Sequence, residues 1–363
     1  MKIRATIYTQ SIINTGAMEE NVKVEKLGVV LEPTQNPFEK KSVLNPGIYQ
    51  EGEYIHMFYR AIDDEFNSSI GYAKLKGPTK VIERSDHPFI ERQHEHESKG
   101  VEDPRVVKID DTYFMTYVVH DGKNAQTAYA TSTDLKHFTE KAVISPEITY
   151  EELGTIVRGE KLKDRYFMFQ AYYEEGAGKD ILVWEKDMFF FPKKINGRYA
   201  LIHRILPDIQ IIYFDTLEQI EDENYWREYL KTLDQFVLLE NKFWFESRNI
   251  GGGAPPIETK DGWLLIFHTV EELNKSRVYR ASAALLDKND PLKVIGRLDY
   301  PLFSPEEEWE TKGFVNNVVF PTGTALFGDD LYVYYGAADK LIGVAKMSLK
   351  ELLNDLKRHK EIA

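Results

Sequence analysis

The sequence predicts an all-β fold, a five-bladed β-propeller forming a single domain over residues 1–363, with a helical insertion at about 217–239 and a C-terminal helix at about 348–358. Aromatic residues make up 13% of the chain, with 21 Tyr and 20 Phe, which is typical of strand-rich proteins. A pattern of a proline, an apolar strand, a tight turn and an aromatic-rich strand occurs five times, at Pro46, Pro104, Pro192, Pro256 and Pro321. No linker rich in Gly, Ser or Pro divides the chain, which favours one domain.

Each copy of the pattern carries three or four short strands, which fits a propeller blade better than a solenoid repeat. The tight turns are Glu51-Gly52, Asp110-Asp111, Asn196-Gly197, Asp261-Gly262 and Gly328-Asp329. We expect the inner strand of each blade to begin at its proline, so that the neighbouring residues surround one central funnel. The spacing between the second and third prolines is the longest, and insertions are expected there.

Two segments depart from this pattern because their apolar residues have helical spacing. The segment from Leu217 to Leu239 is strongly charged and is expected to be an insertion on the rim, either a lid or a contact in a homo-oligomer. The second segment begins at Ser348, with Glu351 three residues later, which is the signature of a capping box. We expect this C-terminal helix to have a packing role.

Composition excludes several classes of function. The net charge of −13 disfavours a nucleic-acid partner, because such binding depends on neutralising phosphates with Lys and Arg. The absence of Cys excludes disulfides and thiolate catalysis. The N-terminus has no apolar stretch typical of a secretory signal and no segment approaches a membrane span, so a cytoplasmic protein is expected, or a periplasmic one if a leader has been removed.

Superposing the five copies collects polar side chains in the funnel that a core does not need. They are Asn45, Arg60, Asp103, Arg105, His120, Asp121, Lys186, His203, Arg204, Asp208, His268 and Asp339. Their interleaving with Tyr, Phe and Trp suits sugars, whose C–H faces stack on aromatic rings while their hydroxyls bond to polar groups. The alternative is a ring of structural salt bridges.

The motif Glu102-Asp103-Pro104-Arg105 stands at the start of a predicted strand, between Gly100 and the proline. The glycine and the proline fix the backbone there, so the two carboxylates can point at a ligand. The alternative is an acid pair that forms a salt bridge with Arg105 and holds a turn.

Other motifs give weaker signals. His94 and His96 alternate and could share a metal, but no third ligand stands at a diagnostic spacing, so no metal is expected. The run Gly251-Gly252-Gly253 lacks the Lys and Ser/Thr of a phosphate loop, so it indicates close backbone approach rather than nucleotide binding.

Six motifs, taken in order, resemble glycoside hydrolase family 130, and the match extends from about residue 45 to residue 345. They are Glu102 to Arg105, Phe191 to Tyr199, Leu201 to Arg204, Gly251 to Pro256, Phe320 to Gly323 and Tyr335 to Asp339. The resemblance implies a five-bladed propeller and an inverting enzyme acting on mannose-containing oligosaccharides, either a phosphorylase or a β-1,2-mannosidase. It implies Asp103 as the general acid, acting through a hydroxyl of the bound mannose, and no cofactor beyond phosphate as a co-substrate of a phosphorylase.

The choice between these reactions depends on the face opposite the acid, which needs either a carboxylate base for water or cations for phosphate. The resemblance places cations at Lys186 and His203, but Gln126 stands where an arginine would be expected, with Glu140 in the next turn. This favours a β-1,2-mannosidase that releases terminal mannose by hydrolysis. The base would then be Glu185 or Glu246, which lie close to funnel motifs.

The alternative is a β-mannoside phosphorylase that produces mannose 1-phosphate, which the lack of a leader favours. A third reading, a non-catalytic glycan-binding propeller, would keep the aromatic residues and lose the acid Asp103, which is present in its full motif.

Overall fold

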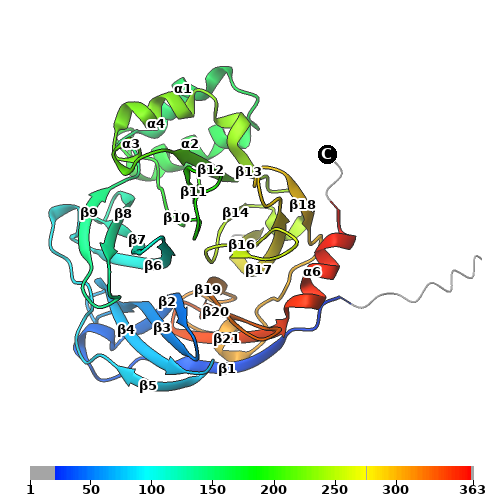
Figure 1. Ribbon diagram of the computed structural model, residues 1–363. Helices are drawn as coiled ribbons and strands as arrows, with labels where there is room; N and C mark the ends of the chain where they lie inside the picture. Colours follow the sequence, from blue (N-terminus) through cyan, green and yellow to red (C-terminus); the bar gives the residue numbers. More distant parts are fainter. Residues whose placement is uncertain (1–20, 275, 361–363) are drawn as a thin grey trace, which may run out of the picture.

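The computed structural model describes residues 21–274 and 276–360, which are mostly β-strand, as the sequence predicts. Figure 1 shows the sheets arranged around a common centre, with most of the helices gathered at one side of the ring. Within the antiparallel groups, consecutive strands are hydrogen-bonded neighbours except β14 (Asn249–Gly252) and β15 (Ile257–Glu258), which both pair with β16 (Trp263–Leu273). Local pairing of this kind follows from the tight turns that the sequence places between strands.

The first sheet contains two antiparallel groups joined by one parallel bridge between Ser68 and Gly100. The first group is β2 (Ser42–Glu51), β3 (Tyr54–Ile62), β4 (Ser68–Lys76) and β5 (Lys80–Arg84). The second group is β6 (Gly100–Ile109), β7 (Thr112–His120), β8 (Ala125–Ser132) and β9 (Thr139–Val143).

Three further sheets follow along the chain. One contains β10 (Phe189–Phe190), β11 (Tyr199–His203), β12 (Ile209–Phe214) and β13 (Val237–Leu239). The next contains β14 (Asn249–Gly252), β15 (Ile257–Glu258), β16 (Trp263–Leu273), β17 (Ser276–Leu286) and β18 (Val294–Arg297). The last contains β19 (Val319–Phe327), β20 (Asp330–Ala337) and β21 (Leu341–Ser348), and the N-terminal β1 (Glu25–Leu31) pairs with β21.

The hydrophobic core lies between neighbouring sheets rather than inside any one of them. Met57 of β3 packs in one cluster with Tyr334 of β20 and Val344 of β21. Phe114 of β7 packs with Phe190 of β10. Each sheet therefore buries its faces against its neighbours, as an assembly of small sheets requires.

The prolines do not begin the inner strands, which corrects the prediction. β2 begins at Ser42 and β6 at Gly100, so Pro46 and Pro104 lie inside these strands, while Pro192 and Pro256 lie outside the strands. Pro321 lies inside β19, and the strand register shifts at all three strand prolines, as in a β-bulge. The residues before Pro46 and Pro104, Asn45 and Asp103, have φ values of 48° and 50°.

Helices fill the two predicted insertions. The long gap before Pro192 contains α1 (Tyr150–Ile156), the 3₁₀ turn η3 (Val157–Gly159) and α2 (Arg165–Ala177). The segment predicted at 217–239 contains α3 (Leu217–Ile220), α4 (Glu223–Leu230) and η4 (Leu233–Phe236), and then ends in β13. Shorter elements are η1 (Pro37–Glu39), η2 (Glu95–Glu97), η5 (Trp244–Glu246) and α5 (Glu308–Thr311). Among the described residues, no helix is long and apolar enough to cross a membrane.

The C-terminal helix α6 (Leu349–Arg358) begins where the capping pattern predicts. The Ser348 hydroxyl accepts a hydrogen bond from the backbone N–H of Glu351 at 3.1 Å. The helix packs Leu352, Leu353 and Leu356 into the core beside the last sheets. It therefore has the packing role expected of it.

We expect Ser348→Ala to lower the free energy of unfolding by about 1 kcal/mol, because the cap is lost while the buried face of α6 is unchanged. Urea unfolding followed by circular dichroism measures this change. Ser348→Thr keeps the hydroxyl and is the matched control. Equal losses in both variants would show that the cap contributes nothing.

Candidate active site

A cavity of about 330 Å³ lies where the sheets meet, lined by strand residues of three sheets and by Lys186, Asp187, Arg204 and Leu206, which flank the strands of the β10–β13 sheet. Seven of the predicted residues line it: Asn45, Arg60, Asp103, Lys186, Arg204, His268 and Asp339. Side chains that are distant in sequence therefore meet at one place, as the superposed copies predict. The volume is typical of a small-molecule site.

The carboxylate of Asp103 points into this cavity from the bulge in β6. Its Oδ1 accepts a hydrogen bond from Asn45 Nδ2 at 2.8 Å and lies 3.8 Å from an Arg60 nitrogen. Asn45 packs closely against the backbone of Gly336. A Cβ atom on Gly336 would lie 2.1 Å from Asn45 Oδ1, so only a glycine fits there. Asp103 is thus oriented by an amide and left open to the cavity.

Glu102 shares Arg60 with Asp103 and pairs in addition with Lys186. Its two carboxylate oxygens accept hydrogen bonds from Arg60 at 2.7 Å and Lys186 at 3.2 Å. Burial alone would raise the pKa of Glu102, but these two cations lower it to about 2. Glu102 therefore carries a permanent charge that offsets two cations of the cavity wall.

Arg105 lies beneath the cavity floor and does not line it, although it was predicted to bind substrate. Its Nε donates to the Gly253 carbonyl at 2.6 Å, and a terminal nitrogen donates to the Asp103 carbonyl at 3.0 Å. No salt bridge joins it to the side chains of the Glu102–Asp103 pair within the described part of the chain. Arg105 holds the backbone that presents Asp103.

Asp187 is the cavity carboxylate that sequence reasoning missed. It lies 2.8 Å from an Arg204 nitrogen, with His268 at 3.9 Å and Arg105 at 4.0 Å. Burial would raise its pKa, but the charge of Arg204 and its neighbours lowers it. Asp187 has a φ of 62°, like Asn45 and Asp103, yet it stands five residues before its proline rather than next to it, so alignment on prolines hid it.

Helix α2 and neighbouring segments supply a cationic and aromatic wall, of which only Phe320 belongs to one of the six sequence motifs. This wall contains Tyr173, Trp184, Arg248, Arg277, Tyr279 and Phe320. The Arg248 guanidinium lies over the rings of Phe169 and Tyr172 and pairs with the half-exposed Glu272 at 2.9 Å. Arg277 has no carboxylate within 4.0 Å among the described residues.

The two carboxylates predicted as general bases lie outside the cavity. Glu185 is fully buried and pairs with His203 at 2.9 Å, and the other ring nitrogen of His203 lies 2.7 Å from the Tyr229 hydroxyl. Glu246 is also fully buried and accepts a hydrogen bond from Arg297 at 2.6 Å. Their proximity to motifs in sequence did not indicate which way their side chains point, and neither can reach a bound ligand.

The remaining predicted residues also lie away from the cavity. Asp121 accepts bonds from two backbone N–H groups of its own turn, and His120 lies beside Trp184. Gln126 is buried within β8, and Glu140 lies on β9. The pair that favoured hydrolysis therefore does not touch the site.

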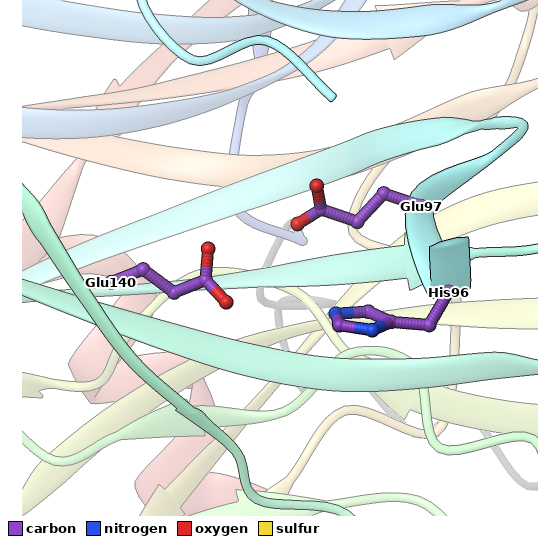
Figure 2. Close-up of side chains that lie close together, drawn as sticks. All are labelled: His96, Glu97 and Glu140. Carbon is purple, nitrogen blue, oxygen red and sulfur yellow. The ribbon is translucent and has the colours of Figure 1, made fainter. Parts of the chain in front are cut away.

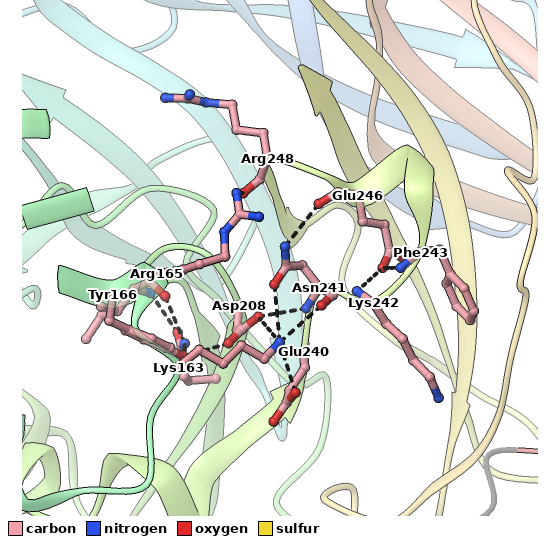
Figure 3. Close-up of polar contacts among 12 residues, drawn as sticks. Lys163, Arg165, Tyr166, Asp208, Glu240, Asn241, Lys242, Phe243, Glu246 and Arg248 are labelled. Carbon is pink, nitrogen blue, oxygen red and sulfur yellow. Dashed lines mark hydrogen bonds and ion pairs between the residues drawn. The ribbon is translucent and has the colours of Figure 1, made fainter. Parts of the chain in front are cut away.

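Asp208 anchors α2 rather than lining the cavity, as Figure 3 shows. Its carboxylate accepts hydrogen bonds from the Tyr166 hydroxyl at 3.0 Å and the Asn241 N–H at 2.7 Å. Burial raises its pKa. Arg165 of the same helix donates to the Arg248 carbonyl at 2.9 Å, so this network positions the wall that carries Arg248.

Sequence comparison decides the family. The family profile of glycoside hydrolase family 130, described as beta-1,4-mannooligosaccharide phosphorylase, matches residues 13–177 and 173–358. The chain belongs to glycoside hydrolase family 130. The resemblance based on the six motifs is confirmed.

Relatives within family 130 match along nearly their whole length. The chain is 34% identical to a 1,2-beta-oligomannan phosphorylase of Thermoanaerobacter sp. (strain X514), with 91% of this chain and 99% of that protein covered. It is also 34% identical to a beta-1,2-mannobiose phosphorylase of the same organism, with 87% and 93% covered. The structure of the beta-1,2-mannobiose phosphorylase from Listeria innocua superposes with a TM-score of 0.69 at 22% identity, covering 92% and 99% of the two chains, which supports the fold.

The pKa of Asp339 predicts how the stability of the protein depends on pH. Burial, together with the charge of Asp103, raises its pKa to about 6, although Arg60 acts in the opposite direction. Because the folded pKa exceeds the unfolded value of 3.8, ionisation of Asp339 lowers the stability of the folded state as the pH rises from about 4 to 6.

We therefore expect Asp339→Asn to unfold at a higher urea concentration than the wild type at pH 7 and to differ little at pH 4. Parallel urea titrations at the two pH values measure this. A variant that is less stable than the wild type at pH 7 would contradict the assignment.

Proposed function

We propose that the protein is an inverting β-1,2-mannoside phosphorylase that releases terminal mannose as mannose 1-phosphate. The observation that carries this proposal is the full-length similarity to two phosphorylases, combined with a cavity whose wall is rich in cations. It replaces hydrolysis, which the sequence favoured, because the residues that supported hydrolysis lie outside the cavity. A phosphorylase uses phosphate as a co-substrate and needs no cofactor.

In the proposed reaction, a phosphate oxygen attacks the anomeric carbon of the terminal mannose from the face opposite the leaving group. The glycosidic C–O bond breaks and a new bond forms between the anomeric carbon and a phosphate oxygen, with inversion. The leaving oxygen takes a proton that originates from Asp103, and the proton carried in by hydrogen phosphate restores the acid after the product leaves. The resemblance implies that a mannose hydroxyl relays this proton. The hydrogen bond from Asn45 and the open position of Asp103 suit such a relay.

The charges of the cavity indicate where phosphate would bind. Arg60 and Lys186 are offset by Glu102, and Arg204 by Asp187. Arg277 has no carboxylate partner among the described residues, and the partner of Arg248 is half-exposed. We assign phosphate to the wall formed by these two arginines, because a charge-assisted pair with phosphate would satisfy them.

The aromatic side chains of the cavity would bind the sugar. Trp184, Tyr279 and Phe320 provide faces on which the C–H surface of a mannose ring can stack. Asp339 and His268 can bond to its hydroxyls. This combination of a complete acid motif with cations and sugar-binding groups disfavours a non-catalytic glycan-binding protein.

We also infer that the architecture is a five-bladed β-propeller. Two antiparallel groups in the first sheet and three further sheets make five groups around the cavity, and β1 completes the group formed by β19, β20 and β21. The cavity then lies on the axis, where strand residues of four groups meet residues that flank the strands of the fifth.

Phosphate dependence tests the function. With β-1,2-mannobiose as substrate, we expect mannose 1-phosphate only when phosphate is present, and a rate lowered by about 10²- to 10⁴-fold in Asp103→Asn. Chromatographic separation of mannose from mannose 1-phosphate measures both products, and β-1,4-mannobiose tests the linkage. Mannose released at equal rates with and without phosphate would mean hydrolysis, and an undiminished Asp103→Asn enzyme would refute the acid.

Arg277→Ala tests the phosphate wall. We expect KM for phosphate to rise at least about tenfold, because the variant loses a charge-assisted hydrogen bond to phosphate. KM for mannobiose should change little. Arg198→Ala is the matched control, because Arg198 pairs with Asp215 on the outside of the fold. If both variants shift KM for phosphate equally, the site assigned to phosphate is wrong.

A further inference from the structure

We propose that His96, Glu97 and Glu140 form a binding site for a divalent transition metal of the zinc type, distinct from the cavity. Figure 2 shows the three side chains converging from η2 and β9. One nitrogen of His96 and one oxygen from each carboxylate all lie within 4.8 Å of one another. None of the three residues lines the cavity, so this site is separate from the proposed reaction.

The distances are close to those of a bound metal. Ligand atoms about 2.1 Å from a tetrahedral zinc ion lie roughly 3.4 Å apart, so the side chains would have to close in by up to about 1.4 Å from the 4.8 Å limit. His96 and Glu140 are only partly buried and can make this adjustment by rotation. Glu97 is held in place, because one of its oxygens accepts hydrogen bonds from the N–H groups of Gln93 and His94.

The charges at this site call for a cation. Glu97 is 1% exposed, and neither it nor Glu140 has a Lys or Arg nitrogen within 4.0 Å among the described residues. Within the described part of the chain, the only ion pair here joins Glu140 to His94, at 3.3 Å. His96 Nε2 is buried and has no hydrogen-bond partner among the described residues. A metal would give this nitrogen a partner and would offset the negative charge of Glu97 and Glu140.

The donor set selects the kind of metal. An imidazole suits zinc, copper, iron or nickel, whereas magnesium and calcium prefer oxygen ligands alone. The third ligand was not visible in the sequence because Glu140 comes from a strand far along the chain, brought near η2 by the pairing of β8 with β9. Water, or His94 beside Glu140, can fill a fourth position.

A metal here would cross-link two segments rather than take part in the chemistry. It would join η2 to β9, and β6, which carries Asp103, begins three residues after η2. Because a ligand that binds only the folded state stabilises it, the metal would raise the melting temperature.

Metal titration tests this inference. The full chain, freed of any tag and treated with a chelator, is titrated with Zn²⁺ by calorimetry and with Co²⁺ by visible absorption. We expect one ion per chain, a tetrahedral Co²⁺ spectrum and a raised melting temperature. In His96→Ala and Glu140→Gln, the affinity should fall at least about tenfold, the loss expected when one ligand is removed.

His137→Ala is the matched control, because His137 forms an exposed pair with Asp134 and belongs to no cluster of three ligands. It should bind Zn²⁺ like the wild type. Absence of stoichiometric binding, or equal affinity in the wild type and in both ligand variants, would overturn the proposal. Phosphorolysis should survive chelation, and its complete loss would refute the separation of this site from the cavity.

Discussion

The pairing of buried charges is the constraint on which the candidate site depends. A cavity surrounded by sheets removes ionised groups from water, so each must find a partner or lose its charge. Glu102 holds Arg60 and Lys186, and Asp187 holds Arg204. These pairs fix the walls from several sheets at once. Asp103 and Arg277 have no strong ionic partner among the described residues. Both are therefore free to act on a ligand.

The backbone conformation determines which polar side chains point into the cavity. Asn45, Asp103 and Asp187 all adopt a left-handed conformation that few residues tolerate, and each aims a polar side chain into the cavity. The bulges of β2 and β6 pack tightly, since a Cβ atom on Gly47 would lie 2.6 Å from the Pro104 carbonyl. Arg105 donates hydrogen bonds to the carbonyl groups of Pro104 and of Gly253 in the neighbouring segment. The unusual conformation is therefore held by neighbouring backbone rather than by the ligand.

The sequence predicted the features that follow from local patterns. It did not predict the features that depend on the direction of a side chain in the folded structure. The strand-rich class, the cap at Ser348 and the cavity position of Asp103 follow from composition, spacing and motif. Asp187 was missed because the third copy places its proline differently. Arg248 and Arg277 were missed because they reach the cavity only beside α2, whose packing no local pattern encodes. For Glu185 and Glu246, nearness in sequence to a motif said nothing about which face of the chain carries the side chain.

The pairing of β1 with β21 joins the start of the described chain to its end, with Glu25 opposite Lys346. The group that presents Asp339 is thus incomplete until β21 has been synthesised. During translation, β1 emerges more than 300 residues before the strand with which it pairs. Such a distant pairing raises contact order and slows folding. The wall of the cavity that carries Asp339 therefore depends on a strand pairing that can form only after the rest of the described sheets have been synthesised.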